Sequence, residues 1–125
     1  MEINRNEVED YLAGVRNAVN SGRYRISPRS KNRELHEDYV MSENKQREIL
    51  LSLTTDDFSE AVQNEHPQHP EEILYIFGKQ VSLYSRFYEG EETVSLYIKF
   101  NKLNNAFLIV ISFHKQEYPL TYKFR

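Results

Sequence analysis

Apolar residues recur at helical spacing near the start of the chain. Four of them lie three or four positions apart: Val8, Leu12, Val15 and Val19. This spacing places their side chains on one face of an α-helix. Asn6 can cap the helix with Glu9 completing a capping box, and Gly22 can end it in a left-handed conformation. The pattern therefore predicts a helix between Asn6 and Gly22.

Two more helices are predicted before residue 64. The first begins at Ser42 and buries three aliphatic residues: Ile49, Leu50 and Leu53. The second is capped by Thr54 or Thr55. Two acids in its first turn suit the helix dipole, Asp56 and Asp57. Its buried face is predicted to hold Phe58, Ala61 and Val62. The segment QNEHPQHPEE (63–72) follows, and its two prolines predict a loop.

From residue 73 onward, apolar and polar residues alternate with period two, which is the period of a β-strand. Five strands are predicted: 73–77, 80–88, 93–100, 106–114 and 120–124. The segments EGEE and NKLNN between them have the composition of hairpin turns. Helices in residues 6–64 followed by an antiparallel sheet in residues 73–124 predict a single α+β domain over residues 1–125.

Alternation assigns the strand side chains to two faces. The buried face is predicted to hold Val81, Leu83, Phe87, Val94, Leu96, Ile98, Phe100, Phe107, Ile109, Ile111 and Phe113. The opposite face is predicted to hold Tyr84, Arg86, Tyr88, Ser95, Tyr97, Lys99, Leu108, Val110, Ser112 and His114. Aromatic rings among cations suit single-stranded RNA, because rings stack on bases and cations hold phosphates. An ordinary solvated sheet face has the same pattern, and this alternative stays open.

Cations are concentrated in the segment RYRISPRSKNR, residues 23–33. It holds no acid and five cations: Arg23, Arg25, Arg29, Lys31 and Arg33. Tyr24 and Ile26 alternate with the first two arginines, which predicts a short edge strand that Pro28 ends. The segment is interpreted either as a phosphate-binding surface or as a solvated loop. Residues 36–38, which follow, are predicted to lie in a solvated connector.

The composition limits the classes of protein that fit. The chain has 125 residues, of which 39% are hydrophobic and 28% charged, and a net charge of −3. These values suit one globular domain and give no global attraction to nucleic acid. Without cysteine there is no disulfide and no thiolate metal site. No apolar run is long enough to span a bilayer, and the first residues, MEINRNEVED, are unlike a secretory signal. We therefore expect a cytoplasmic protein that does not act at a membrane.

Four short segments give the chain a resemblance to a known family. They are VNSGRYRIS at the end of a helix, LTTDDF, LYIKF and LIVISFHK. In this order and spacing, over residues 8–115, the chain resembles the MqsR family of toxins from bacterial toxin–antitoxin pairs. The resemblance implies a RelE-like fold and sequence-selective cleavage of messenger RNA without the ribosome, a metal or another cofactor. It also implies a cognate antitoxin protein that binds and neutralises the toxin.

The resemblance also implies site residues. Two family positions are kept, because the tyrosine and lysine of its V-Y-x-K strand fall on Tyr97 and Lys99. Its lysine after S-F falls on His114, with Lys115 next. Its lysine two residues after D-F falls on Glu60, which reverses the charge. Two of four positions are thus changed (the fourth, a glutamine, falls near residues 71–72), which bears on substrate preference and on activity itself.

Metal-free RNA cleavage needs a base for the 2′-hydroxyl, an acid for the leaving oxygen and cations for the phosphate. The residues predicted to supply these groups are Tyr97, His114, Lys99, Lys115 and Glu72. A histidine has an ordinary pKa of about 6.5, so His114 can serve as acid or base. The residues predicted to bind RNA are Arg86, Tyr84, Tyr88, Arg23, Arg25, Arg29, Lys31 and Arg33. Plain structural roles for His114 and Tyr97 stay open.

Other functions also stay open. A non-catalytic inhibitor from a phage or mobile element, which binds a partner protein on the same scaffold, is favoured by Glu60 and by the acidic net charge. A plain RNA-binding module is a third possibility. His66 and His69, with Glu65 or Glu71, are the nearest approach to a metal site. Their prolines exclude helical i,i+4 geometry and no third histidine is near, so no metal is expected.

Overall fold

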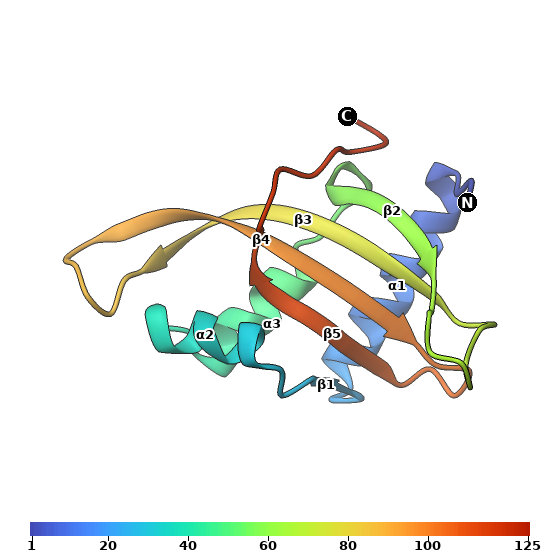
Figure 1. Cartoon of the computed structure of the whole chain (residues 1–125), viewed down its shortest axis with the longest axis horizontal. Coiled ribbons are helices and arrows are strands. Elements are labelled where there is room, and N and C mark those ends of the chain that lie inside the picture. Colours follow the sequence, from blue (N-terminus) through green and yellow to red (C-terminus); the bar gives the residue numbers. More distant parts are fainter.

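Five strands form one sheet in a computed structural model that describes all 125 residues (Figure 1). The elements are α1 (Arg5–Asn20), β1 (Tyr24–Ile26), α2 (Ser30–Asp38), α3 (Glu43–Leu51), the 3₁₀ turn η1 (Thr55–Asp57), β2 (Phe58–Gln63), β3 (Ile73–Tyr84), β4 (Glu91–Lys102) and β5 (Leu108–Lys115). The strand order is β1-β5-β4-β3-β2, antiparallel except for β1 beside β5. The predicted α+β class, with the helices first, is confirmed.

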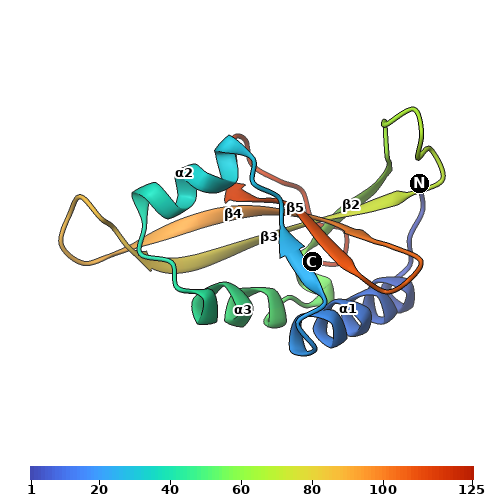
Figure 2. The same cartoon turned by 90° about the horizontal axis from the view of Figure 1, so that it is seen from below.

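Helices α1 and α3 lie on the same side of the sheet, and both are below it in Figure 2. Their apolar faces and the inner face of the sheet share one core, which includes Val15, Leu50, Phe77, Ile98 and Phe113. Burying these side chains away from water is the main force that holds the layers together. On the other side of the sheet, α2 lies along β5 (Figure 2), and the end of the chain crosses the sheet (Figure 1). We call this side the open face.

The predicted first helix is confirmed, but its cap lies two residues earlier than expected. Asn4 Oδ1 accepts a hydrogen bond from the Glu7 N–H (2.9 Å), and the Glu7 carboxylate accepts one from the Asn4 N–H (3.3 Å). These two residues form the capping box in place of Asn6 and Glu9. Gly22 follows the helix with φ +72°, the left-handed conformation that its lack of a side chain permits. The helix predicted from Ser42 is also confirmed, as α3.

Helix α2 was not predicted, because residues 30–38 were interpreted as part of a loop and a connector. The helix packs beside β5, where Asn32 is buried. The Asn32 amide donates to Ile111 O (3.0 Å) and to Ser27 O (2.9 Å), and its oxygen accepts from the Phe113 N–H (2.8 Å). One side chain thus satisfies the backbone of β5 beyond the end of β1, as a further strand would.

The third predicted helix, from Thr54 or Thr55 through Val62, is wrong. Residues 55–57 form one 3₁₀ turn, and residues 58–63 form β2. The pairing of β2 with β3 shifts by one residue between Phe58 and Glu60, which is a β-bulge. The bulge lets Phe58 and Ala61, three residues apart, both point into the core. The buried apolar residues of this bulged strand therefore have the same spacing in the sequence as those of a helix.

A second bulge corrects the predicted faces of β5. Phe100 pairs with Val110 whereas Lys99 pairs with Ser112, so Ile111 has no partner of its own. Leu108 and Val110 are buried, and Phe107, Ile109 and Ile111 are only half-buried. The prediction had exchanged these two sets. Beyond the bulge the alternation matches the prediction again, with Phe113 inside and Ser112 and His114 on the open face.

Two predicted strand boundaries are also corrected. Residues 73–84 form one continuous strand, and residues 85–90 form the turn that follows it. Phe87 lies in that turn with 70% of its surface exposed, so it is not a core residue. Residues 120–124 form no strand. None of the helices is long and apolar enough to cross a membrane.

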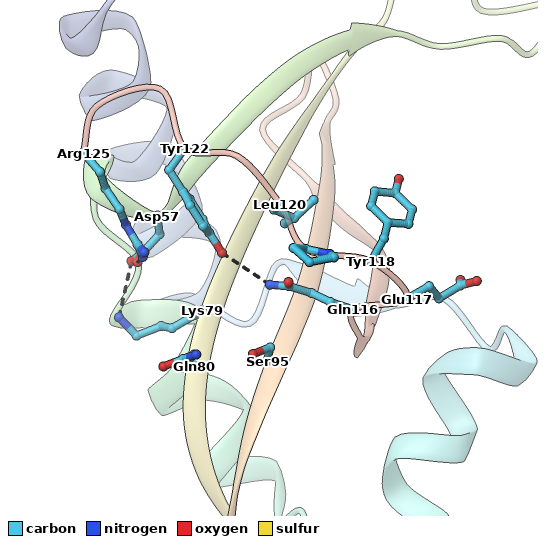
Figure 3. A pocket seen from close by; sticks show the side chains of 11 residues that line it. Asp57, Lys79, Gln80, Ser95, Gln116, Glu117, Tyr118, Leu120, Tyr122 and Arg125 are labelled. Atoms are coloured by element: carbon cyan, nitrogen blue, oxygen red, sulfur yellow. Dashed lines mark hydrogen bonds and ion pairs between the residues drawn. The ribbon is translucent and has the colours of Figure 1, made fainter.

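The end of the chain, residues 116–125, crosses the open face of the sheet as an irregular segment that we call the C-terminal strap (Figure 3). It passes over Gly78, where a Cβ atom would come within 2.8 Å of Leu120 Cδ1 and 2.9 Å of Gln116 Nε2. The Lys123 N–H donates to Phe58 O (3.1 Å). Arg125 pairs with the buried carboxylate of Asp57 (3.5 Å). The strap is thereby fixed at both the middle and the end of its path.

Candidate functional site

The pairing of β4 with β5 places three predicted site residues, together with Ser112, on the open face. Tyr97 is directly opposite His114, and Lys99 is directly opposite Ser112. They line a depression of about 500 Å³, which we call the central depression. Residues from two other elements complete its rim, the start of α2 and the C-terminal strap: Arg29, Ser30, Lys31, Glu117 and Tyr118.

His114 lines this depression, and the backbone sets which of its ring nitrogens carries the proton. Its Nδ1 lies 2.8 Å from the carbonyl oxygen of Lys115, which can only accept a hydrogen bond. We therefore assign the proton of the neutral ring to Nδ1, which leaves the lone pair on Nε2. The ring stacks on Tyr97, with 5.3 Å between ring centroids and 14° between planes. The stacking fixes the orientation of both rings.

Tyr97 is suited to donate a proton and not to remove one. Its pKa is raised above the ordinary tyrosine value, mainly because the side chain is half-buried. The nearby Tyr118, Glu60 and Glu117 raise it further by disfavouring a phenolate. The hydroxyl therefore stays protonated at neutral pH.

The depression also collects positive charge. Lys99 is half-buried, and burial lowers the pKa of its amine, with Arg29 adding a smaller effect of the same sign. Neither Lys99 nor Arg29 forms an ion pair with an acid of the chain. Helix α2 starts at this rim with no side-chain cap and no acid in its first turn. Its free N–H groups add to the positive potential.

Glu72 does not join this set, contrary to the prediction. It lines a second depression of about 620 Å³, which shares only Arg29 and Lys99 with the first. Its Oε1 accepts hydrogen bonds from the side-chain amides of Asn64 and Asn101, both at 3.0 Å. The amide of Asn101, more than any other group, lowers the pKa of Glu72. A carboxylate stabilised in this way is a weak base.

Other predicted residues lie elsewhere. Lys115 points away from His114, and its amine lies 3.4 Å from the Tyr39 hydroxyl on the far side of the sheet. Arg86 donates to Tyr39 O (3.2 Å) in the turn between β3 and β4, where Tyr84 and Tyr88 are exposed. These four residues are at the hairpin end of the molecule and are not part of the central depression.

The basic segment 23–33 is divided by the fold. Only Arg29 and Lys31 line the central depression. Arg25 is exposed on β1 opposite Ile109, next to the second depression. Arg23 donates to Asn105 O (2.7 Å) and Arg33 to Pro28 O (3.0 Å), which ties both to local backbone. Of the five cations predicted to form a phosphate-binding surface, two therefore line the central depression.

Sequence reasoning missed Ser30, Glu117 and Tyr118. They enter the site because α2 and the strap converge on β5, and no local pattern marks that meeting. The residues best placed to hold a metal ion are His69, Glu71 and Glu72, whose ligand atoms lie within 4.8 Å of one another. They are in the loop between β2 and β3, outside the central depression. The sequence matches no protein-family model and no curated protein.

Replacing Lys99 with methionine is expected to raise the melting temperature at neutral pH and to weaken binding to nucleic acid. A lysine whose pKa is lower in the folded than in the unfolded protein destabilises the fold at any pH at which its amine is charged in both states. That cost is largest at neutral and lower pH and shrinks as the pH rises toward the ordinary lysine pKa. The gain of Lys99→Met should therefore decrease over the same range.

Thermal unfolding of the original protein and of Lys99→Met, measured from pH 6 to pH 10, checks this expectation. Lys45→Met on α3 is the control, because the Lys45 amine pairs with Glu48 (3.8 Å) and lies outside the depression. A lower melting temperature in Lys99→Met than in the original protein would contradict the inference that burial of the charged Lys99 amine destabilises the fold.

Proposed function

We propose that the protein is a metal-independent endoribonuclease that cleaves messenger RNA in the cytoplasm, with a RelE-like fold and a cognate antitoxin protein that neutralises it. The observation that supports this most is the arrangement around His114. A histidine with one free ring nitrogen, a protonated tyrosine and three cations, Arg29, Lys31 and Lys99, line one depression. The likeness of the segments at residues 8–115 to MqsR-family toxins points to the same chemistry.

The residues can divide the reaction as follows. Nε2 of His114 takes the proton of the 2′-hydroxyl, and the resulting oxygen attacks the adjacent phosphorus. Lys99 and Arg29 stabilise the extra negative charge on the phosphate. Tyr97 gives its proton to the departing 5′-oxygen. The products are a 2′,3′-cyclic phosphate and a 5′-hydroxyl end, with no water or metal required for the cleavage step.

Incubation of the purified protein with a long unstructured RNA in EDTA tests the proposal. We expect discrete cuts whose new 5′ ends carry a hydroxyl, and we expect the same cuts with Mg²⁺ present. Expression of the protein in bacteria should arrest growth, and a cognate antitoxin should reverse the arrest. RNA that stays intact with a folded sample would exclude the nuclease.

A non-catalytic partner-binding protein is the second candidate. Two observations favour it. Glu60 is exposed on β2, at the position where the MqsR-like pattern has a lysine, so the charge there is reversed. The turn after β3 also exposes Phe87 and Tyr88, at 70% and 74% of their surfaces, which is typical of a surface that meets another protein. Intact RNA together with a stable one-to-one complex with a host protein would support this function.

A further inference from the structure

An acid of the protein already occupies part of the cationic rim. Glu117, on the C-terminal strap, forms an ion pair with the amine of Lys31 near the start of α2. Its carboxylate lines the central depression together with His114 and Tyr97. The hydrogen bond with Lys31 is the main reason why the pKa of Glu117 is below the ordinary value, and His114 adds to it. Glu117 is therefore ionised beside the proposed base.

The other cations of the depression differ in this respect. Lys31 forms an ion pair with an acid of the protein, whereas Arg29 and Lys99 form none. An RNA phosphate that enters the depression meets two free cations and one that is already paired. The side chains of Lys31 and Glu117 are both exposed, at 58% and 55% of their surfaces. An exposed ion pair is weak, so a phosphate can displace the carboxylate.

We propose that Glu117 is an internal competitor of the RNA phosphate: its carboxylate holds Lys31 in the free protein and must leave Lys31 when RNA binds. This inference rests on the proposed function, because it takes the occupant of the depression to be the backbone of a nucleic acid. Glu117 acts through Lys31 and is a positioning residue. It sets the affinity of the site for RNA and makes Lys31 available only when substrate is present.

The path of the strap explains why Glu117 can perform this role. Gln116 donates to Leu96 O (3.0 Å), and the strap then runs over Gly78 to its contacts with Phe58 and Asp57. The backbone is thus fixed on both sides of Glu117. The side chain itself is held only by Lys31, so it can leave without unfolding the strap.

A binding measurement with a non-cleavable probe tests the inference. The probe is a fluorescein-labelled single-stranded oligodeoxyribonucleotide, which has phosphates but no 2′-hydroxyl and therefore binds without reaction. Glu117→Gln should bind it about three- to fivefold more tightly than the original protein at low salt, as expected for release of one exposed ion pair. The gain should decrease as salt rises, because salt screens the competing charges.

Two further variants make the test specific. Glu65→Gln removes the same charge from the neighbouring depression, where the acid forms no ion pair and acts on Lys99 only as a nearby charge. It should give a smaller gain than Glu117→Gln. In a Lys31→Ala background, the substitution Glu117→Gln should give no gain beyond that of Glu65→Gln in the same background, because the two residues then no longer interact.

Three results would overturn the inference: equal gains from Glu117→Gln and Glu65→Gln, a gain that persists in full without Lys31, or no measurable binding by any variant. The outcome is independent of catalysis. Tighter binding that depends on Lys31, with RNA that stays intact, would support the anion competition and reject the nuclease. Cleavage of RNA by a protein whose affinity is unchanged in Glu117→Gln would support the nuclease and reject the anion competition.

Discussion

His114→Ala is expected to lower the rate of RNA cleavage by about 10²- to 10⁴-fold, the usual contribution of a positioned proton transfer. The cause is the loss of Nε2, the ring nitrogen that the hydrogen bond at Nδ1 leaves free to act as the base. Affinity for RNA should change little, because the three cations of the depression remain. Single-turnover cleavage in EDTA, with saturating protein, measures the chemical step separately from binding.

Lys115→Ala is the matched control for this variant. It alters the next residue of the same strand, but the side chain removed lies on the other face, against Tyr39. Cleavage should stay within about threefold of the original rate. Tyr97→Phe keeps the stacked ring and loses the hydroxyl, so it should lower the rate without disturbing His114. Full activity in His114→Ala, or a loss in Lys115→Ala as large as in His114→Ala, would reject the site assignment.

The largest effect on stability is expected from Asn32→Ala. The substitution leaves three backbone groups without their partner: Ser27 O, Ile111 O and the Phe113 N–H. A buried polar group left unpaired costs about 1–3 kcal/mol, and water can reach part of this edge once the side chain is gone. We expect the free energy of unfolding to fall by about 2–4 kcal/mol, measured by urea denaturation.

Asn44→Ala provides the comparison. Asn44 is exposed on α3, so its replacement should change the free energy of unfolding by less than about 0.5 kcal/mol. Asn32 also holds the start of α2 against β5, and with it Arg29 and Lys31. Nucleic-acid binding by Asn32→Ala should therefore weaken under conditions in which the protein is still folded. A variant as stable as the original would show that α2 is not held to β5 in this way.

Local patterns were sufficient for several elements. The apolar stripe of α1 and the alternation in β4 follow directly from periodicity, because each element buries one regular face. The alternation of β4 also placed Tyr97 and Lys99 on the open face, where the structure has them. The edge strand at Tyr24–Ile26 was found from the same kind of pattern. These features depend on residues that are neighbours in the sequence.

Tertiary contacts decided the rest. Residues 58–63 are a strand because β3 offers them backbone partners, and the bulge there gave them the apolar spacing of a helix. Helix α2 has little apolar periodicity, with Asn32 and Leu35 as its buried residues, and it is held by hydrogen bonds to β5 that no sequence pattern reveals. The strap lacks strand pairing and lies where Gly78 leaves room for it.

The candidate site shows the same division. The sequence alone determined which chemical groups the protein has and which of them share a face within one strand, since both are local properties. It grouped Tyr84, Arg86 and Lys115 with His114, but the tertiary structure separates them, and it brings in Glu117 and the start of α2. The distance between groups on different strands depends on register, bulges and the packing of distant segments, which are set by the whole fold.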